Sequence, residues 1–168
     1  MSLQNAEARG VHVLTYEELF AMADVVVIIE PISTEKTADK YPDDSHLPES
    51  SSFISYNTTF KVLGALKGAV NTEKPFVVLY FNYPENTARA NGADFISFAL
   101  EPIQFSGIIK RNENDAGEAI GSLFGGKPRW LAFLKKRDGG RYESVSDPYD
   151  AAMSFQEIHH PFIYKLGH

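Results

Sequence analysis

The sequence predicts a mainly β protein, an antiparallel barrel or sandwich of about seven strands with two short flanking helices. Short runs of β-branched and aromatic residues recur along the chain, separated by Gly, Pro, Asn and Asp. These strand-like runs do not alternate with long helical segments, which argues against a parallel, doubly wound sheet. The most secure element is a β-hairpin late in the chain.

That hairpin is predicted at residues 130–145. Residues 130–134 are all apolar, a pattern typical of a strand that is covered on both faces. Asp138, Gly139 and Gly140 follow, and they tolerate the positive φ angles of a tight turn. The pattern therefore indicates a central strand that turns back into a second, shorter strand.

The N-terminal elements begin with a helix. Thr15 and Glu18 have the spacing of a capping box, so we expect a short helix through about Met22, with Leu19, Phe20 and Ala23 available for packing. The β-branched run at 25–29 predicts a buried strand, which Pro31 should bring towards an end.

The middle of the chain holds a loop and two strands. Residues 33–52 are polar and charged, and we interpret them as a long exposed loop. Strands are predicted at 53–66 and at 76–81, and Gly64 indicates a bulge or sharp bend in the first of them.

The second half is less regular. We expect a loop at 84–94, short strands at 95–100 and 104–109, and a second long loop at 112–126. A second capping box, at residues 154–157, predicts a short terminal helix.

Composition bounds the class of protein. The 168 residues are 43% hydrophobic and 23% charged, which is typical of one globular domain, predicted over 1–168 with its core at about 14–158. The absence of cysteine excludes disulfides and thiolate metal sites. A net charge of −6 disfavours general nucleic-acid binding. No apolar run approaches the roughly 20 residues that span a bilayer.

Three segments carry a family resemblance. Ala-Asp-Val-Val-Val-Ile-Ile at 23–29, Thr-Thr-Phe-Lys-Val-Leu-Gly-Ala-Leu-Lys-Gly at 58–68 and Trp-Leu-Ala-Phe-Leu-Lys-Lys at 130–136 occur in that order. Over about 22–146 the chain resembles the netrin-module and tissue-inhibitor-of-metalloproteinase-like family, including its small bacterial relatives. The resemblance implies an OB-like barrel of five strands with helices packed against it. It also implies export to the periplasm or the outside of the cell, with the signal absent from this sequence; the residues alone leave the compartment open.

No functional residue follows from the resemblance. Family members that inhibit metalloproteinases chelate the enzyme's zinc with an N-terminal cysteine, whereas this chain begins with Met1 and contains no cysteine. We therefore carry over no functional residue and name no catalytic residue, and we expect neither a metal nor a cofactor.

The candidate site is the basic hairpin. Six cations stand against one acid, Asp138, with aromatic residues between them. On an OB-like barrel such a surface can contact single-stranded nucleic acid or a glycan, while the alternative is a charged turn that keeps a strand end soluble. The candidate residues are Lys127, Arg129, Trp130, Lys135, Lys136, Arg137, Arg141 and Tyr142.

Other motifs favour ordinary structural roles. Residues 121–127 resemble a phosphate-binding loop, but Pro128 stands where Ser or Thr is needed. Residues 112–117 lack the ligand spacing of a calcium loop. His159 and His160 are adjacent, so their side chains point in different directions on a helix.

Function therefore stays open between three hypotheses. The first is a non-enzymatic β-barrel module that binds a protein or another macromolecule. The second is a small hydrolase or small-ligand-binding barrel whose site is assembled from distant residues. The third is single-stranded nucleic-acid or glycan binding through the hairpin at 127–141. The sequence leaves the partner and the oligomeric state open.

Overall fold

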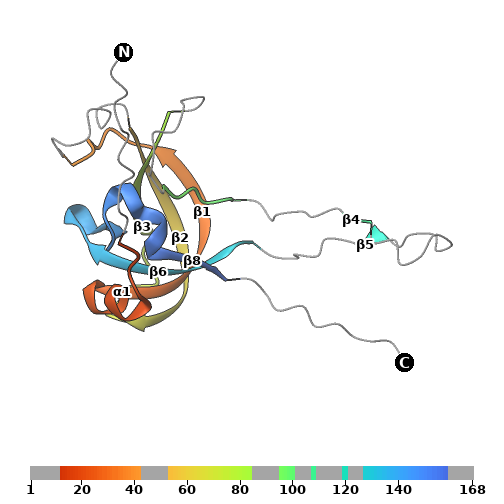
Figure 1. Cartoon of the computed structure of the whole chain (residues 1–168), viewed down its shortest axis with the longest axis horizontal. Helices are drawn as coiled ribbons and strands as arrows, with labels where there is room; N and C mark the ends of the chain where they lie inside the picture. The colour runs from red at the N-terminus through yellow and green to blue at the C-terminus, as the bar shows by residue number, and fades with distance from the viewer. Residues whose placement is uncertain are drawn as a thin grey trace, which may run out of the picture.

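A closed five-stranded β-barrel forms the body of the protein (Figure 1). The computed structural model describes residues 12–42, 53–84, 95–100, 107–108, 119–120 and 127–158. The barrel strands are β1 (Val25–Lys36), β2 (Ile54–Lys67), β3 (Phe76–Asn82), β6 (Arg129–Lys136) and β7 (Tyr142–Ser144). The mainly β, barrel-like fold class is confirmed.

The strand order is that of an OB-like barrel. The sheet runs β1-β2-β3-β7-β6 and closes because β6 also pairs with β1. Neighbouring strands are antiparallel except for β3 and β7, which are parallel and meet at Val78 and Tyr142. An additional strand, β8 (Phe155–Ile158), pairs with the first half of β6, while β7 pairs with its second half.

Side chains fill the interior of the barrel. β1, β3 and β6 each turn alternate residues inward, because successive side chains of a strand point to opposite faces. The Phe98 ring lies among them, 4.8 Å from the ring centre of Phe60, 5.3 Å from Tyr80, 5.4 Å from Trp130 and 5.1 Å from Phe155. Phe98 thus joins four strands in one aromatic contact set.

One short helix, α1 (Tyr16–Met22), covers the outside of β1 and β6 (Figure 1). Its predicted capping box is present, since the Thr15 hydroxyl accepts from the Glu18 amide while the Glu18 carboxylate accepts from the Thr15 amide. Leu19 packs against Phe133 of β6. Since Ala132 and Leu134 face the barrel core, β6 is covered on both faces, as predicted.

The predicted hairpin is confirmed. β6 and β7 are joined by a single 3-10 turn, η2 (Asp138–Gly140). Gly139 and Gly140 both have positive φ, 77° and 76°, the backbone region that a residue without a Cβ adopts at no steric cost.

The predicted loop at 33–52 is wrong at its start. β1 continues through Pro31 to Lys36 and stays paired with β2. The register of the pair shifts between Pro31 and Ser33, and a proline is tolerated in a strand at such an irregularity. Two further register shifts lie on either side of the pairing of Gly64 with Ile28, as expected of the bulge that was one of the two features predicted there.

The predicted strand at 95–100 is also wrong. These residues have no regular secondary structure, and Ile96 and Phe98 are buried in the core. Of the predicted strand at 104–109, the structure has β4 (Gly107–Ile108), which pairs with β5 (Ala119–Ile120) in a separate two-stranded sheet. The rest of this region lies outside the described residues.

The helix near the C-terminal end differs from its prediction. A 3-10 helix, η3 (Pro148–Ser154), stops where the predicted helix was to begin, and β8 follows it. The reason lies in the Ser154 hydroxyl, which accepts the Ser146 amide at 3.0 Å and lies 2.7 Å from the Ser146 hydroxyl. Ser154 therefore ties η3 to the end of the hairpin instead of capping a new helix.

Candidate binding surfaces

The basic residues of the hairpin lie close to acidic partners. Arg129 Nε is 3.7 Å from Glu30 Oε2 on β1. Lys135 Nζ is 3.3 Å from Glu143 Oε1, and Arg137 pairs with the other oxygen of the same carboxylate. These pairings reduce the positive charge that the hairpin offers to an anionic ligand.

The two candidate aromatic side chains are partly buried and pack against the core. Trp130 meets Phe98 edge to face inside the barrel. The Tyr142 ring stacks on Phe76 with 4.2 Å between ring centres and 19° between planes. Both rings are partly buried against the barrel core, which leaves less of each ring available for stacking on a base or a sugar.

The remaining two lysines are exposed. Lys127 precedes β6, and the Lys136 side chain points to solvent. The backbone N–H of Lys136, and not its side chain, donates to Asp24 Oδ2 at 2.7 Å. The hairpin as a contact site stays a prediction, with these two lysines as its exposed cations.

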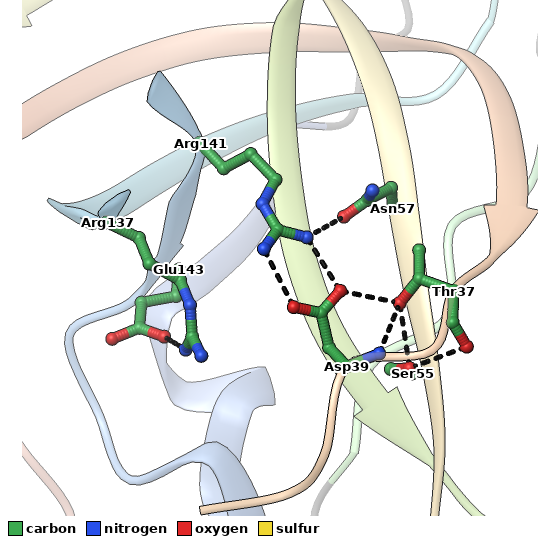
Figure 2. A network of polar contacts seen from close by, with 7 residues as sticks. All are labelled: Thr37, Asp39, Ser55, Asn57, Arg137, Arg141 and Glu143. Carbon is green, nitrogen blue, oxygen red and sulfur yellow. Dashed lines mark hydrogen bonds and ion pairs between the residues drawn. The ribbon is translucent and has the colours of Figure 1, made fainter. Parts of the chain in front are cut away.

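Arg141 occupies a different place. Its guanidinium donates to both oxygens of Asp39 at 2.7 Å each and to Asn57 Oδ1 at 3.2 Å (Figure 2). Figure 2 also shows Arg137 and Glu143 as a separate pair. The Arg141 contacts join the β6–β7 hairpin to residues that follow β1, since Arg141 and Asp39 are 102 positions apart in sequence.

The Asp39 carboxylate has further support from its own segment. The Thr37 hydroxyl lies 2.8 Å from Asp39 Oδ2 and 2.8 Å from the Ser55 hydroxyl, and the Ser55 hydroxyl donates to the Thr37 carbonyl at 3.0 Å. The hydrogen bonds from Arg141, with a smaller contribution from Thr37, lower the pKa of Asp39 from 3.8 to about 2. The same pair raises the pKa of Arg141.

An aromatic cluster lies beside this ion pair, apart from the barrel core. Tyr41 packs edge-on against Phe53 and Phe81, with ring centres 4.9 Å and 5.1 Å apart. OB-fold barrels bind oligonucleotides and sugars on the outer face of their second and third strands. Here the chain's own residues occupy that face. The cluster comprises Phe53, Leu79, Phe81, Tyr83 and Tyr149, with Tyr41 and Phe95 packed against it.

A second surface is apolar and exposed. Val13, Tyr16, Phe20 and Met22 lie on or just before α1, and we call them the α1 surface; their exposed fractions are 74%, 59%, 43% and 51%. A shallow, open depression is lined by Tyr16, Glu17, Phe20 and Ala21. The sequence placed Phe20 among the packing residues, so its exposure is a correction.

The far end of α1 is held by β2. Lys67 Nζ donates to the Phe20 carbonyl at 2.6 Å and to the Ala21 carbonyl at 3.3 Å, and it lies 5.1 Å from the centre of the Phe20 ring. A cation at this position satisfies carbonyls that a helix leaves without partners at its C-terminus. The α1 surface is therefore presented on a helix that is capped at its start and tied to β2 at its end.

Metal and membrane features can be judged for part of the chain. Over residues 12–42, 53–84, 95–100 and 127–158, no three His, Asp or Glu side chains gather as metal ligands would. His159, His160 and the motif at 112–117 lie outside those ranges, as does most of the motif at 121–127. No helix in the described part of the chain is long and apolar enough to cross a membrane.

The geometry thus offers two outer faces of one OB-like barrel, one covered by a segment of the chain and one bearing exposed apolar side chains. No protein-family model and no curated protein matches this chain, so membership of the netrin-module family stays a prediction.

Proposed function

We propose that this protein is a non-enzymatic β-barrel module that binds another protein, and that the α1 surface is its contact site. One observation carries the proposal: Tyr16 and Phe20, which are 59% and 43% exposed, line one open depression on a helix that packs on the barrel through Leu19 and Ala23. Exposed apolar patches with a polar rim mark protein contact sites more often than single exposed residues do.

The residue types on this helix suit a protein interface. Tyr16 and Phe20 are four positions apart and line the same depression. Aromatic side chains are enriched in interfaces, since they bury much area and lose little conformational freedom on binding. The depression is shallow and open, which suits a side chain of a partner protein better than an enclosed small molecule.

The anchoring of α1 adds to the case. Leu19 and Ala23 are 3% exposed and pack on the barrel, while Lys67 holds the last carbonyls of the helix. A contact surface that is already fixed before binding avoids the entropy loss of ordering it.

The competing hypotheses have less support. A small-ligand-binding or hydrolytic barrel requires a cavity lined by polar groups, but packed side chains around Phe98 occupy the barrel interior. Nucleic-acid or glycan binding through the hairpin requires free cations and exposed rings. Arg129, Lys135, Arg137 and Arg141 have acidic partners instead.

Site-specific photocrosslinking tests the proposal. A benzophenone amino acid replaces Phe20 in one form of the protein and Ile32 in another, and both are irradiated in an extract of the source cells. Ile32 is a matched control, because it is 52% exposed, apolar and located on β1 away from α1. We expect a protein that is crosslinked from position 20 and not from position 32.

The partner found in this way is then purified and titrated with the protein by calorimetry. Phe20→Gln should weaken binding at least about tenfold, while Ile32→Gln should leave it unchanged. Identical crosslinking patterns at the two positions, or equal affinities of the two variants, would contradict the proposal.

A further inference from the structure

We infer that residues 37–42 form a strap that Asp39 and Arg141 latch across the outer face of β2 and β3, and that breaking this latch opens the aromatic face beneath. This inference concerns a different face from the α1 surface, so it does not depend on the proposed function. It rests on the two-bond geometry of the Asp39–Arg141 pair, on the one-sided packing of the strap and on the side chains that the strap covers.

The latch is a directional contact between two connections of the barrel. Arg141 lies at the start of β7, and its two terminal nitrogens each meet one oxygen of Asp39 at 2.7 Å. This parallel, two-bond geometry is the strongest form of an arginine–carboxylate contact. Side-chain exposures of 25% for Arg141 and 21% for Asp39 place the pair at the edge of the covered face, where solvent can reach it.

The strap packs on one side only. Thr37, Asp39 and Tyr41 are partly buried, whereas Ala38, Lys40 and Pro42 are exposed. The Thr37 amide donates to the Ser55 carbonyl at 2.9 Å, so the start of the strap is still attached to β2. Segments with few buried apolar contacts open locally at lower free energy than the strands beneath them.

The covered face is aromatic and polar. Phe53 and Phe81 are 9% and 2% exposed, and the Tyr41 ring packs edge-on against both. Asn57 lies beside them and accepts a hydrogen bond from Arg141. Release of the strap would uncover the parts of these rings that Tyr41 covers and free the Arg141 guanidinium on the face where other OB-fold barrels bind ligands. The strap is therefore an intramolecular occupant of that face, and the latch keeps it in place.

Hydrogen–deuterium exchange of the full chain tests the inference. In Arg141→Ala the amides of Thr37 and Asp39 should exchange at least about tenfold faster than in the unmodified protein, while amides of β1 and β6 keep their rates. The fluorescence of the apolar dye ANS should rise in the same variant, because the dye binds newly exposed apolar surface.

Two further variants make the test specific. Arg137→Ala removes another arginine of the same hairpin, one that pairs with Glu143, and it should leave exchange in the strap unchanged. Asp39→Asn removes the charge with almost no change of shape, so it serves in place of Arg141→Ala if that variant does not fold. The double variant Asp39→Asn, Arg141→Ala should exchange no faster than the faster of its two single variants.

Three results would overturn the inference. Strap exchange that is unchanged in Arg141→Ala means that the ion pair is no latch. Exchange that rises equally in β1 and β6 means that the pair stabilises the whole barrel and not the strap. An effect of Arg137→Ala as large as that of Arg141→Ala means that hairpin charge in general, and not this contact, is responsible.

Discussion

The barrel has two covered outer faces, and they are covered by different kinds of interaction. α1 is held on β1 and β6 mainly by apolar burial, with Leu19 and Phe133 in contact. The strap is held by the Asp39–Arg141 ion pair, by hydrogen bonds between Thr37 and Ser55 of β2, and by packing of the Tyr41 ring. Apolar burial is insensitive to pH and moderate salt, whereas a partly exposed ion pair weakens when the pH falls and when the salt concentration rises. Low pH or high salt should therefore release the strap more readily than α1.

The covers also differ in what they show to solvent. α1 leaves parts of Tyr16 and Phe20 exposed, although the Tyr16 ring also lies against Phe133 and its hydroxyl donates to Gln156 of β8. The strap exposes Ala38, Lys40 and Pro42. The exposed aromatic surface thus lies on the firmly attached cover, and the hidden aromatic surface lies beneath the releasable one. This contrast is why we assign recognition to α1 and movement to the strap.

The largest expected effect comes from breaking the apolar attachment of α1. Leu19→Ala should lower the free energy of unfolding by about 2–5 kcal/mol, because a side chain that is 3% exposed leaves a cavity against Val26 and Phe133. Chemical denaturation measures this loss. Met22→Ala is the matched control on the same helix. Its side chain is 51% exposed, so the change should stay within about 0.5 kcal/mol. Equal losses in the two variants would show that α1 is not anchored through Leu19.

A smaller effect should follow from titration of the latch. The pKa of Asp39 is about 2 in the folded protein and 3.8 ordinarily, so the pair stabilises the fold fully above pH 3.8 and progressively less as the pH falls towards 2. Asp39 faces Arg141 and, less closely, Arg137, whose own partner is Glu143. The unmodified protein should lose about 1–2 kcal/mol more over this range than Asp39→Asn does.

Denaturant unfolding of both proteins from pH 5 to pH 2.5, in steps of about half a pH unit, measures this difference. All other carboxylates titrate in both proteins, so the difference between the two pH profiles reports Asp39 alone. Parallel pH profiles would show that Asp39 contributes nothing to stability. A steeper loss in Asp39→Asn would reverse the sign and contradict the depressed pKa.

Local signals in the sequence were sufficient for the hairpin and for α1. Gly139 and Gly140 define the turn, and the spacing of Thr15 and Glu18 defines the start of the helix. The end of β1 could not be predicted in this way. Ser33 and Thr34 are polar and follow a proline, and they remain in the strand because β2 pairs with them, a contact between residues about 24 positions apart.

The sequence identified residues of the candidate site, but it did not predict which contacts their side chains make. The sequence indicated Arg141 as a cation of the hairpin, but its partner Asp39 is 102 positions away, and no periodicity links the two. Trp130 and Tyr142 were predicted as contact residues because they stand between the cations of the hairpin. The face to which a strand's side chains point depends on its register, which the sequence alone does not give. The register turns both rings towards the core. The exposed pair Tyr16 and Phe20 could have been found from its four-residue spacing.

A smaller effect is expected from removing the N-cap of α1. Thr15→Ala removes the hydroxyl that accepts the Glu18 amide at 3.2 Å, and it should lower the free energy of unfolding by about 0.5–1 kcal/mol. Thr15→Ser keeps a capping hydroxyl and should recover most of the loss, as measured by thermal or chemical unfolding. If Thr15→Ser is as unstable as Thr15→Ala, the loss comes from packing of the methyl group and not from the cap.

The smallest effect is expected at the tip of the hairpin. Lys136→Ala should change the free energy of unfolding by less than about 0.5 kcal/mol. The Lys136 side chain is exposed, and the hydrogen bond to Asp24 is made by the Lys136 backbone N–H, which the substitution keeps. Arg141→Ala, in the same hairpin, should cost more, since it leaves the Asp39 carboxylate without its two strongest donors. Denaturant unfolding of the two variants side by side, at low and at high salt, measures both values.

The cost of Arg141→Ala should shrink at high salt and that of Lys136→Ala should not. A loss in Lys136→Ala that equals the loss in Arg141→Ala would show that the tip of the hairpin contributes through its charge alone, and the contrast between a latched arginine and a solvated lysine would not hold.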